Sequence, residues 1–463
     1  MKLINNLKSQ FFAKKSSKPA EITKWNNTLN TDINYRLLVA ILVLVAGFSC
    51  IFIANNVITH INTNTWQYEE PGVIPVYPPI GNDFRVGLYR PAENLVKSGF
   101  KSIGPDDTYP SVYPPLVGVI SLPYLLFSHQ TAYLIHVGLL ILANIICLAL
   151  ASLMAKEYVL SKLGMEDKYT AIISVFIFFA MAIYTFSSFS FAYSMERGNV
   201  DIFAIFFFML AMWCLLKKPD KIWLQVILLS IAVHFKIYPA ALFIILLFKH
   251  GKKLILPAVV VNLFFLFILG PKMALSFIRS VTASGEGAGV GNAWSGVGNH
   301  AAYSFTMGVD TTSGEFLSGT FFVLWAIFTL IPLTLWGIAA IALILKKYST
   351  QNAILLLMVT IPMMDVVPTI SVDYRLVIES SAVLLLIALI IKQIIQKHSW
   401  FDLMQLAVVM FLLLMIGRSY AFFDESLFVF RNKYVWVLLL EVVMVVNIIK
   451  NQKDCYSVHE SGG

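Results

Sequence analysis

The stretch that decides the fold is TAYLIHVGLLILANIICLALASLMA, residues 131–155. None of its side chains is Asp, Glu, Lys or Arg. A helix needs roughly 20 predominantly apolar residues to cross the hydrocarbon of a bilayer, and only a helix or a closed barrel satisfies every backbone polar group there. The stretch therefore predicts a transmembrane α-helix.

The composition of the whole chain agrees with this prediction. Of the 463 residues, 58% are hydrophobic and 13% are charged, and the mean hydropathy is +0.76; an average soluble domain carries about 25% charged residues. This excludes a soluble enzyme, a disordered protein, a secreted disulfide scaffold and a sequence-specific DNA-binding protein, so no nucleic-acid partner is expected. The four cysteines show no C-x-x-C spacing and predict neither a zinc site nor a disulfide framework.

Similar apolar runs recur along the chain and predict an all-α polytopic membrane protein. Residues 112–128 are also apolar, but Pro114, Pro115 and Pro123 interrupt them, so we expect a re-entrant or interfacial helix there. The predicted architecture is about twelve transmembrane helices plus this broken segment. The twelve runs are 34–57, 131–155, 169–190, 199–216, 220–235, 237–250, 253–270, 318–345, 352–371, 374–396, 401–422 and 428–449.

Positive charge orients these helices, because Lys and Arg gather in the cytoplasmic loops of membrane proteins. Basic residues from Lys2 to Lys24 precede the first run and Arg36 lies at its start, and the later lysine clusters fall on the same side if residues 112–128 do not cross. Both termini are then cytoplasmic. The predicted parts are a cytoplasmic basic arm (1–33), a transmembrane catalytic module (34–270) with an external loop (58–112) and the broken segment (112–128), an external glycine-rich loop (271–317), C-terminal transmembrane helices (318–449) and a cytoplasmic tail (450–463).

Polar and charged residues gather in four places that this topology puts at external helix ends. Ionisable groups next to the hydrocarbon are costly and indicate a functional site by default. In the first external loop, Asp83 is placed to act as a general base toward a hydroxyl group; Tyr89 and Tyr113 follow it in the sequence. The alternative is that Asp83 caps a helix or faces water.

The second cluster, residues 194–201, is a polar stretch between two apolar runs. Asn199 is placed to cap the helix that follows, and Asp201 suits the first turn of that helix. Arg197 either binds a phosphate or pairs with its neighbour Glu196. The sequence leaves these two interpretations of Arg197 open.

The third cluster holds His234, Lys236 and Tyr238 between the two shortest runs, which predicts a turn at the floor of an external cavity. Lys236 there binds an anion or extends outward to lipid headgroups. The fourth cluster is Asp373-Tyr374-Arg375, which forms a structural ion pair or supplies a further cation for a phosphate.

Arg197, Lys236 and Arg375 thus supply three cations at external helix ends. Converging buried cations indicate a bound anion, and phosphate is the natural candidate. The glycine-rich stretch 284–299 lacks the Gly-Lys-Ser/Thr of a nucleotide loop. It is interpreted as a mobile lid or substrate loop, with His300 as a candidate substrate ligand beside it, or as a flexible linker.

The order of these motifs resembles that of a known family. Asp83 is followed by Tyr113-Pro114-Pro115-Leu116, by Arg197-Gly198-Asn199-Val200-Asp201 and by Lys236-Ile237-Tyr238-Pro239. This order resembles integral-membrane glycosyltransferases of the C superfamily, in particular glycosyltransferase family 87, the polyprenyl-phosphomannose-type transferases. The resemblance covers roughly 34–260 and extends more weakly to Asp373-Tyr374-Arg375.

The resemblance implies an inverting glycosyltransferase that moves a monosaccharide from a polyprenyl-phosphate donor to a hydroxyl of a glycan or glycolipid acceptor, on the external face of the membrane. Asp83 would be the catalytic base, and Arg197, Lys236 and Arg375 would bind the donor phosphate. Asn82 stands where many relatives carry a second acidic residue, so no metal or other cofactor is expected. The candidate substrate ligands are Tyr89, Tyr113, Glu196, Asn199, Asp201, His234, Tyr238, Asp373, Tyr374 and His300.

Two other functions remain open on the sequence. A polysaccharide polymerase or ligase would use a polyprenyl-pyrophosphate glycan, and a flippase or transporter of lipid-linked sugars would show internal repeats, of which we find none. The Lys-, Asn- and Ile-rich composition fits a bacterium with an AT-rich genome, and the resemblance implies the cytoplasmic membrane of such a cell as the location. No motif encodes the sugar, the acceptor or the linkage, which depend on the shape of the pocket.

Overall fold

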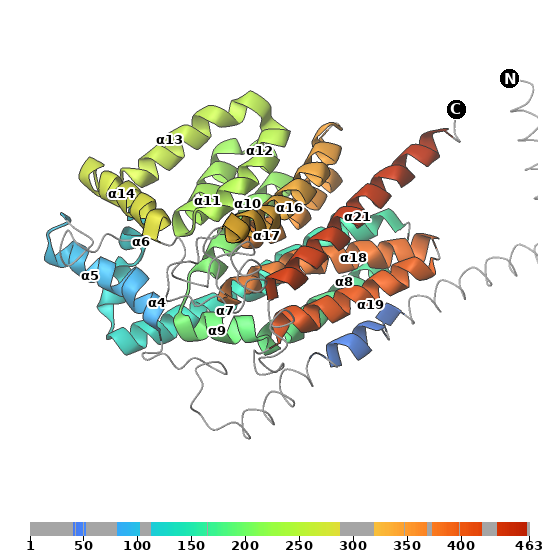
Figure 1. Cartoon of the computed structure of the whole chain (residues 1–463), viewed down its shortest axis with the longest axis horizontal. Helices are drawn as coiled ribbons and strands as arrows, with labels where there is room; N and C mark the ends of the chain where they lie inside the picture. The colour runs from blue at the N-terminus through green and yellow to red at the C-terminus, as the bar shows by residue number, and fades with distance from the viewer. Residues whose placement is uncertain are drawn as a thin grey trace, which may run out of the picture.

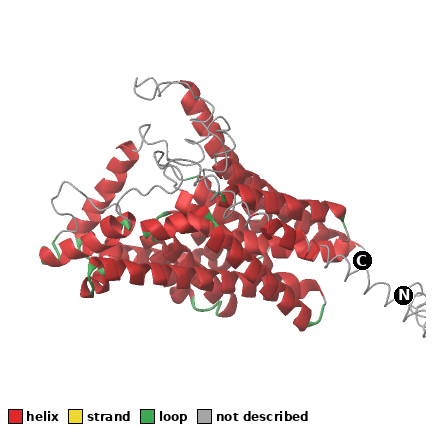
Figure 2. Ribbon diagram, turned by 90° about the horizontal axis from the view of Figure 1, so that it is seen from below, coloured by secondary structure: helices red, strands yellow, loops and turns green. Residues whose placement is uncertain are grey.

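The computed structural model describes residues 40–51, 81–101, 113–287, 319–367, 373–397, 399–418 and 433–460, except residues 42, 50, 164 and 347. Side chains are described over the same ranges apart from residues 280–328, 373–374, 397 and 452–460. Every regular element in these ranges is a helix (Figure 2). The predicted all-α class is confirmed for this part of the chain.

The segment predicted as the first external loop contains helices. These are α4 (Asn82–Phe84), the π-helical turn η3 (Arg85–Tyr89) and α5 (Arg90–Lys97). The proline-broken segment follows as α6 (Pro115–Ile120) and the 3-10 helix η4 (Leu122–Leu126). Pro115 suits the first position of α6 because that amide needs no partner within the helix. Together α6 and η4 are shorter than the roughly 20 residues that a spanning helix needs.

The quoted stretch forms α7 (His129–Met154), which runs on through η5 (Ala155–Val159) and η6 (Leu160–Leu163). Ser128 caps α7, since its hydroxyl accepts the Thr131 amide at 3.3 Å. The chain continues through α8 (Asp167–Ser187), α9 (Phe189–Arg197) and α10 (Asp201–Lys217). A bend of 108° separates α9 from α10.

Short helices form the middle of the chain. They are α11 (Ile222–Phe235), η7 (Tyr238–Leu242), α12 (Phe243–His250), η8 (Gly251–Leu254), α13 (Ile255–Leu266) and α14 (Pro271–Gly287). Helix α14 lies where the sequence predicted the start of a long glycine-rich loop. Leu95 of α5 and Met273 of α14 pack together with Leu122 and Leu269, so the two segments predicted to be external meet at one end of the molecule (Figure 1).

The C-terminal part consists of α16 (Gly319–Ile344), α17 (Thr350–Val366), η10 (Asp373–Ile378), α18 (Glu379–Lys397), α19 (Trp400–Gly417) and α21 (Lys433–Glu460). Helix α21 continues into the residues predicted as a cytoplasmic tail. Helix α18 packs against α7, α8, α17 and α19. Its apolar window is entirely buried, whereas about half of each other candidate span is exposed. Helix α18 therefore lies at the core of the bundle. Each of the other candidate spans has an exposed face that lipid can cover.

The described residues contain five helices that are long and apolar enough to cross a membrane, or up to seven if each of two bent helix pairs is one span. This confirms a multi-pass membrane protein. The count of twelve spans is not confirmed. Run 220–235 corresponds to a helix of 14 residues, and runs 237–250 and 253–270 share one continuous helical stretch, Tyr238–Leu266.

Candidate active site

The site is built around the corner between α9 and α10. Gly198 ends α9 with a φ of +64°, a left-handed conformation that favours glycine. A Cβ at this position would lie 2.8 Å from the Cβ of Phe84. The corner can therefore form only where the chain has no side chain, and it turns Arg197 and Asn199 toward α4.

Both of these side chains donate hydrogen bonds to the carboxylate of Asp83. The Nε and Nη2 atoms of Arg197 donate to Oδ1 of Asp83 at 3.0 and 2.5 Å, and Nδ2 of Asn199 donates to Oδ2 at 2.8 Å. The side chains of Arg197 and Asp83 are 23% and 13% exposed. Arg197 thus pairs with a residue 114 positions away, and the carboxylate of its neighbour Glu196 also interacts electrostatically with it.

Asp201 is the second carboxylate of the site. It begins α10 and is fully buried. The hydroxyl of Tyr238 donates to its Oδ1 at 2.6 Å, and its own amide donates to Oδ1 of Asn199 at 3.1 Å. The predicted capping is thus present in altered form, because Val200 occupies the N-cap position while the Asn199 side chain still accepts the first amide.

Two further cations approach Asp201. Nζ of Lys236 lies 3.9 Å from its Oδ2, and Nε of Arg375 lies 3.8 Å from its Oδ1. Arg375 also lies 4.0 Å from Oδ1 of Asp365 and stacks over the ring of Tyr238 at 4.6 Å. Lys236 therefore points into the protein toward Asp201, which removes the alternative of a lysine that extends outward to lipid headgroups.

Tyr113 covers Lys236. The Lys236 Nζ lies 5.0 Å from the centroid of the Tyr113 ring and 3.5 Å from its hydroxyl. A Cβ at Gly87 would collide with this ring, so the glycine in η3 lets it approach. Burial, together with the carboxylates of Asp83 and Asp201, raises the pKa of Tyr113 above its ordinary value. The phenol stays protonated and can donate a hydrogen bond.

The structure brings together eight of the predicted site residues, which come from the start of α4, the α6 segment, the α9–α10 corner, the α11–η7 turn and η10. They are Asp83, Tyr113, Arg197, Asn199, Asp201, Lys236, Tyr238 and Arg375. Their roles stay predictions. The arrangement provides carboxylates that can transfer protons and cations that can stabilise an anionic leaving group. A group-transfer reaction requires both kinds of side chain.

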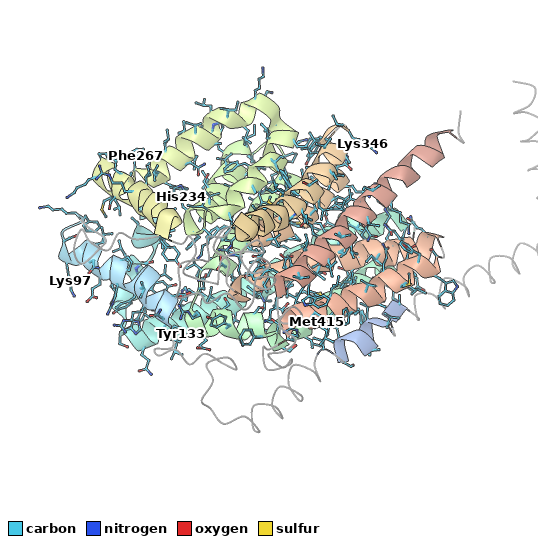
Figure 3. The ribbon with its side chains drawn as sticks, viewed as in Figure 1. Lys97, Tyr133, His234, Phe267, Lys346 and Met415 are labelled. Carbon is cyan, nitrogen blue, oxygen red and sulfur yellow. The ribbon has the colours of Figure 1, made fainter. Side chains whose placement is uncertain are left out.

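Two predicted ligands, Tyr89 and His234, have other surroundings, whereas the carboxylate of Glu196 interacts electrostatically with Arg197. The Tyr89 hydroxyl donates to the carbonyl of Phe127 at 3.2 Å. The backbone carbonyl of Glu196 accepts the Gly81 amide at 2.7 Å. The ring of His234 lies against Phe265 of α13, with centroids 5.5 Å apart; in Figure 3 it lies on the α11 side of the molecule, away from Tyr133 beside α9.

His300 lies outside the described residues, and so do the side chains of Asp373 and Tyr374, whose backbone opens η10. Among the described residues, no group of three or more His, Cys, Asp or Glu side chains is placed to hold a metal ion. The absence of a cofactor stays a prediction.

Sequence reasoning missed two buried residues at this site. Asp365 of α17 is the second carboxylate beside Arg375, and His136 of α7 hydrogen-bonds to the α9–α10 corner. Each is a polar side chain inside an apolar run, and such residues in a membrane helix indicate function by default. That signal was available for both.

The comparison with known families agrees with this geometry. No curated protein matches the chain. The family model of glycosyltransferase family 87 matches residues 112–368, which is more than half of the chain and includes Tyr113, the α9–α10 corner and Lys236. It starts after Asp83 and extends well beyond the range 34–260 over which the motifs resemble the family. The chain therefore belongs to glycosyltransferase family 87.

Proposed function

We propose that this glycosyltransferase moves a monosaccharide from a polyprenyl-phosphate donor to a hydroxyl group of a glycan or glycolipid, with inversion at the anomeric carbon, on the external face of a bacterial cytoplasmic membrane. The observation that carries the proposal is the convergence of Asp83, Arg197, Lys236 and Arg375 in one half-buried site at the ends of membrane helices. The family membership supports the reaction type.

Asp83 is the proposed base. Its carboxylate takes the proton of the acceptor hydroxyl as the acceptor oxygen bonds to the anomeric carbon. The bond from that carbon to the phosphate oxygen breaks on the opposite face, and its electron pair stays with the polyprenyl phosphate. A single displacement of this kind inverts the anomeric configuration.

The cations are proposed to stabilise the leaving phosphate. Negative charge grows on that group as the bond breaks, and fixed charges in a site shielded from water stabilise it strongly. Lys236 is the first candidate, because its amine lies 3.9 Å from Asp201, longer than a charge-assisted hydrogen bond. Tyr113 can donate a further hydrogen bond beside it.

Arg197 is proposed to interact with both the base and the leaving phosphate. It holds the Asp83 carboxylate through two hydrogen bonds, and Asp83 becomes neutral when it accepts the proton. The negative charge that Arg197 balanced has then moved to the leaving phosphate. An arginine with five N–H donors can follow that charge without leaving the site.

The test is an assay of purified protein, reconstituted in lipid, with a panel of polyprenyl-phosphate and polyprenyl-pyrophosphate sugars. We expect release of free polyprenyl phosphate from one of the monophosphate donors, together with transfer of its sugar to an acceptor hydroxyl and inverted linkage. Turnover of pyrophosphate-linked glycans alone would support a polymerase or ligase instead. Movement of lipid-linked sugars across the bilayer with no change in their linkage would support a flippase.

A further inference from the structure

We infer that His136 is a positioning residue for the transfer reaction: it fixes the corner that presents Arg197 and Asn199 to Asp83. The inference rests on the proposed function, in which Asp83 is the base. His136 lies in α7, within the apolar stretch 131–155, and it is fully buried. Its imidazole bonds to the backbone carbonyl of Gly198 and to the hydroxyl of Tyr124, so we infer that it acts through the backbone.

The hydrogen bonds of His136 define one tautomer. Its Nε2 lies 3.0 Å from the carbonyl oxygen of Gly198, and its Nδ1 lies 2.8 Å from the hydroxyl of Tyr124. A carbonyl oxygen only accepts, so Nε2 carries the proton. In the neutral ring Nδ1 is then the acceptor, and Tyr124 donates to it. The chain of bonds runs from Tyr124 through His136 to Gly198.

The same face of α7 holds the neighbouring backbone. The hydroxyl of Tyr133 donates to the carbonyl of Met195 at 2.8 Å and lies 3.2 Å from that of Glu196. The amide of Gly81, just before α4, donates to the Glu196 carbonyl at 2.7 Å. The backbone carbonyls of Met195, Glu196 and Gly198 thus all accept hydrogen bonds from residues outside α9. Gly198 lies between Arg197 and Asn199, the two residues that donate to Asp83.

The ring of His136 also contacts the residue that follows Asp83 in α4. Its centroid lies 4.8 Å from that of Phe84, the residue after Asp83. One imidazole therefore touches α4 beside Asp83 and the corner beside Arg197. Because Asp83 accepts hydrogen bonds from both sides of Gly198, a shift of this corner would move Arg197 and Asn199 together relative to the carboxylate.

Tyr124 extends the connection to the phosphate end of the site. It lies in η4, at the end of the segment that begins with Tyr113, which covers Lys236. His136 thereby joins the segment that carries Tyr113 to the corner that carries Arg197. A membrane helix also uses polar side chains simply to hold helices together, and that role predicts a loss of stability without a selective loss of turnover.

The first experiment compares transfer by the full-length protein with His136→Leu, His136→Gln and, as a matched control, Ser152→Ala. Glutamine can donate an amide N–H near the position of Nε2, whereas leucine cannot. Ser152 is buried on the same helix and bonds to Ser174, far along α7 from the corner. Displacement of a catalytic group by about 1 Å costs about 100-fold in rate.

We expect His136→Leu to lower kcat by about 100-fold with a donor KM within about threefold of the wild type. His136→Gln should recover most of the rate, and Ser152→Ala should retain it. Wild-type kcat in His136→Leu, or equal loss in the leucine and glutamine variants, would overturn the inference. If His136→Leu does not fold, Tyr124→Phe removes the hydroxyl that orients the ring and should lower kcat by about 3- to 10-fold; unchanged kcat there would also overturn it.

The second experiment does not depend on activity. Hydrogen–deuterium exchange is followed in peptides that cover residues 194–201, in which the Gly198 and Asn199 amides bond to the carbonyls of Met195 and Ser194. We expect faster exchange in His136→Leu than in the wild type, His136→Gln and Ser152→Ala. Equal exchange in all four proteins would refute the positioning role. If the wild type instead releases no polyprenyl phosphate from any donor, the proposed function fails while the exchange result still decides the role of His136.

Discussion

The carboxylate of Asp83 accepts three hydrogen bonds from two side chains of one corner. These bonds fix the direction in which its oxygens face, as a general base requires. An asparagine in its place keeps the size of the side chain but cannot take up the proton.

We therefore expect Asp83→Asn to lower kcat by about 10²- to 10⁴-fold, the usual contribution of a general base. Binding of the donor should be nearly unchanged, because the cations remain. Single-turnover transfer and equilibrium binding of a labelled donor measure the two effects separately. Turnover at the wild-type rate would rule out Asp83 as the base.

Lys236 is the cation to test for the phosphate. Loss of a hydrogen bond to a charged group costs about 1.5–3 kcal/mol, so we expect Lys236→Ala to lower kcat/KM for the donor by about 10- to 100-fold, with an effect on both parameters. Lys221→Ala, an exposed lysine before α11, is the matched control and should behave as the wild type. Equal kinetics in both variants would leave Lys236 without a role in donor binding.

The sequence identified charged residues that the structure brings together, but it did not predict which of them form pairs. Arg197, Lys236 and Arg375 stand out because a charge beside an apolar run is costly. Their pairings do not stand out, since Asp201 had a simple explanation at the first turn of a helix, and a charge inside an apolar run, such as Asp365, does not show which cation it meets. Pairing across 114 positions depends on how helices pack, which local sequence does not encode.

The α9–α10 corner is the element on which the site depends. Its backbone is left-handed at Gly198, and α9 ends where Arg197 must face α4. An L-residue in that conformation costs about 1–2 kcal/mol, and its Cβ would also collide with Phe84.

Gly198→Ala should therefore lower both the melting temperature and the rate of transfer. Gly138→Ala is the control, because a Cβ at Gly138 of α7 meets no atom within 4 Å and alanine favours a helix. Melting curves and transfer assays on both variants measure the difference. A Gly198→Ala protein as stable and as active as Gly138→Ala would mean that the corner tolerates a side chain.

Long helices were predictable from the sequence, and short ones were not. The run 131–155 became α7 and the run 401–422 corresponds to α19, because about 20 apolar residues without a break specify a helix. The run 199–216 became α10, but the preceding polar residues formed a separate helix, α9, at 108° to it. That angle is set by one backbone conformation at Gly198, and apolar periodicity carries no information about it.

Helix α18 lies at the centre of the whole molecule. The sequence predicted this helix as one span among twelve, and its hydropathy resembles that of the others. Its central position follows from which helices pack on it, including α7 and α8, far earlier in the chain. The number of crossings and the side of the active site are likewise properties of the whole molecule.

The topology can be tested with single cysteines in a variant whose four native cysteines are replaced by serine. We expect Val86→Cys in η3, where the side chain is 53% exposed, to react with a membrane-impermeant maleimide on intact cells or spheroplasts. Asp220→Cys, between α10 and α11, should react only after the membrane is opened. The opposite pattern would put the site on the cytoplasmic side and contradict the predicted orientation.

The separation of Asp83 from Arg197 has a consequence for how the protein is made. Ribosomes add about 5–20 residues per second, so roughly 10 s pass between the synthesis of Asp83 and that of the arginine 114 positions later. The time between the synthesis of Asp201 and that of its partner Arg375 is longer still. Until then each carboxylate must stay hydrated or protonated, and the site closes only when late helices reach early ones. In an Asp83→Cys variant, nascent chains stalled before residue 197 should therefore react with a maleimide at position 83. Longer chains should protect this cysteine from the reagent.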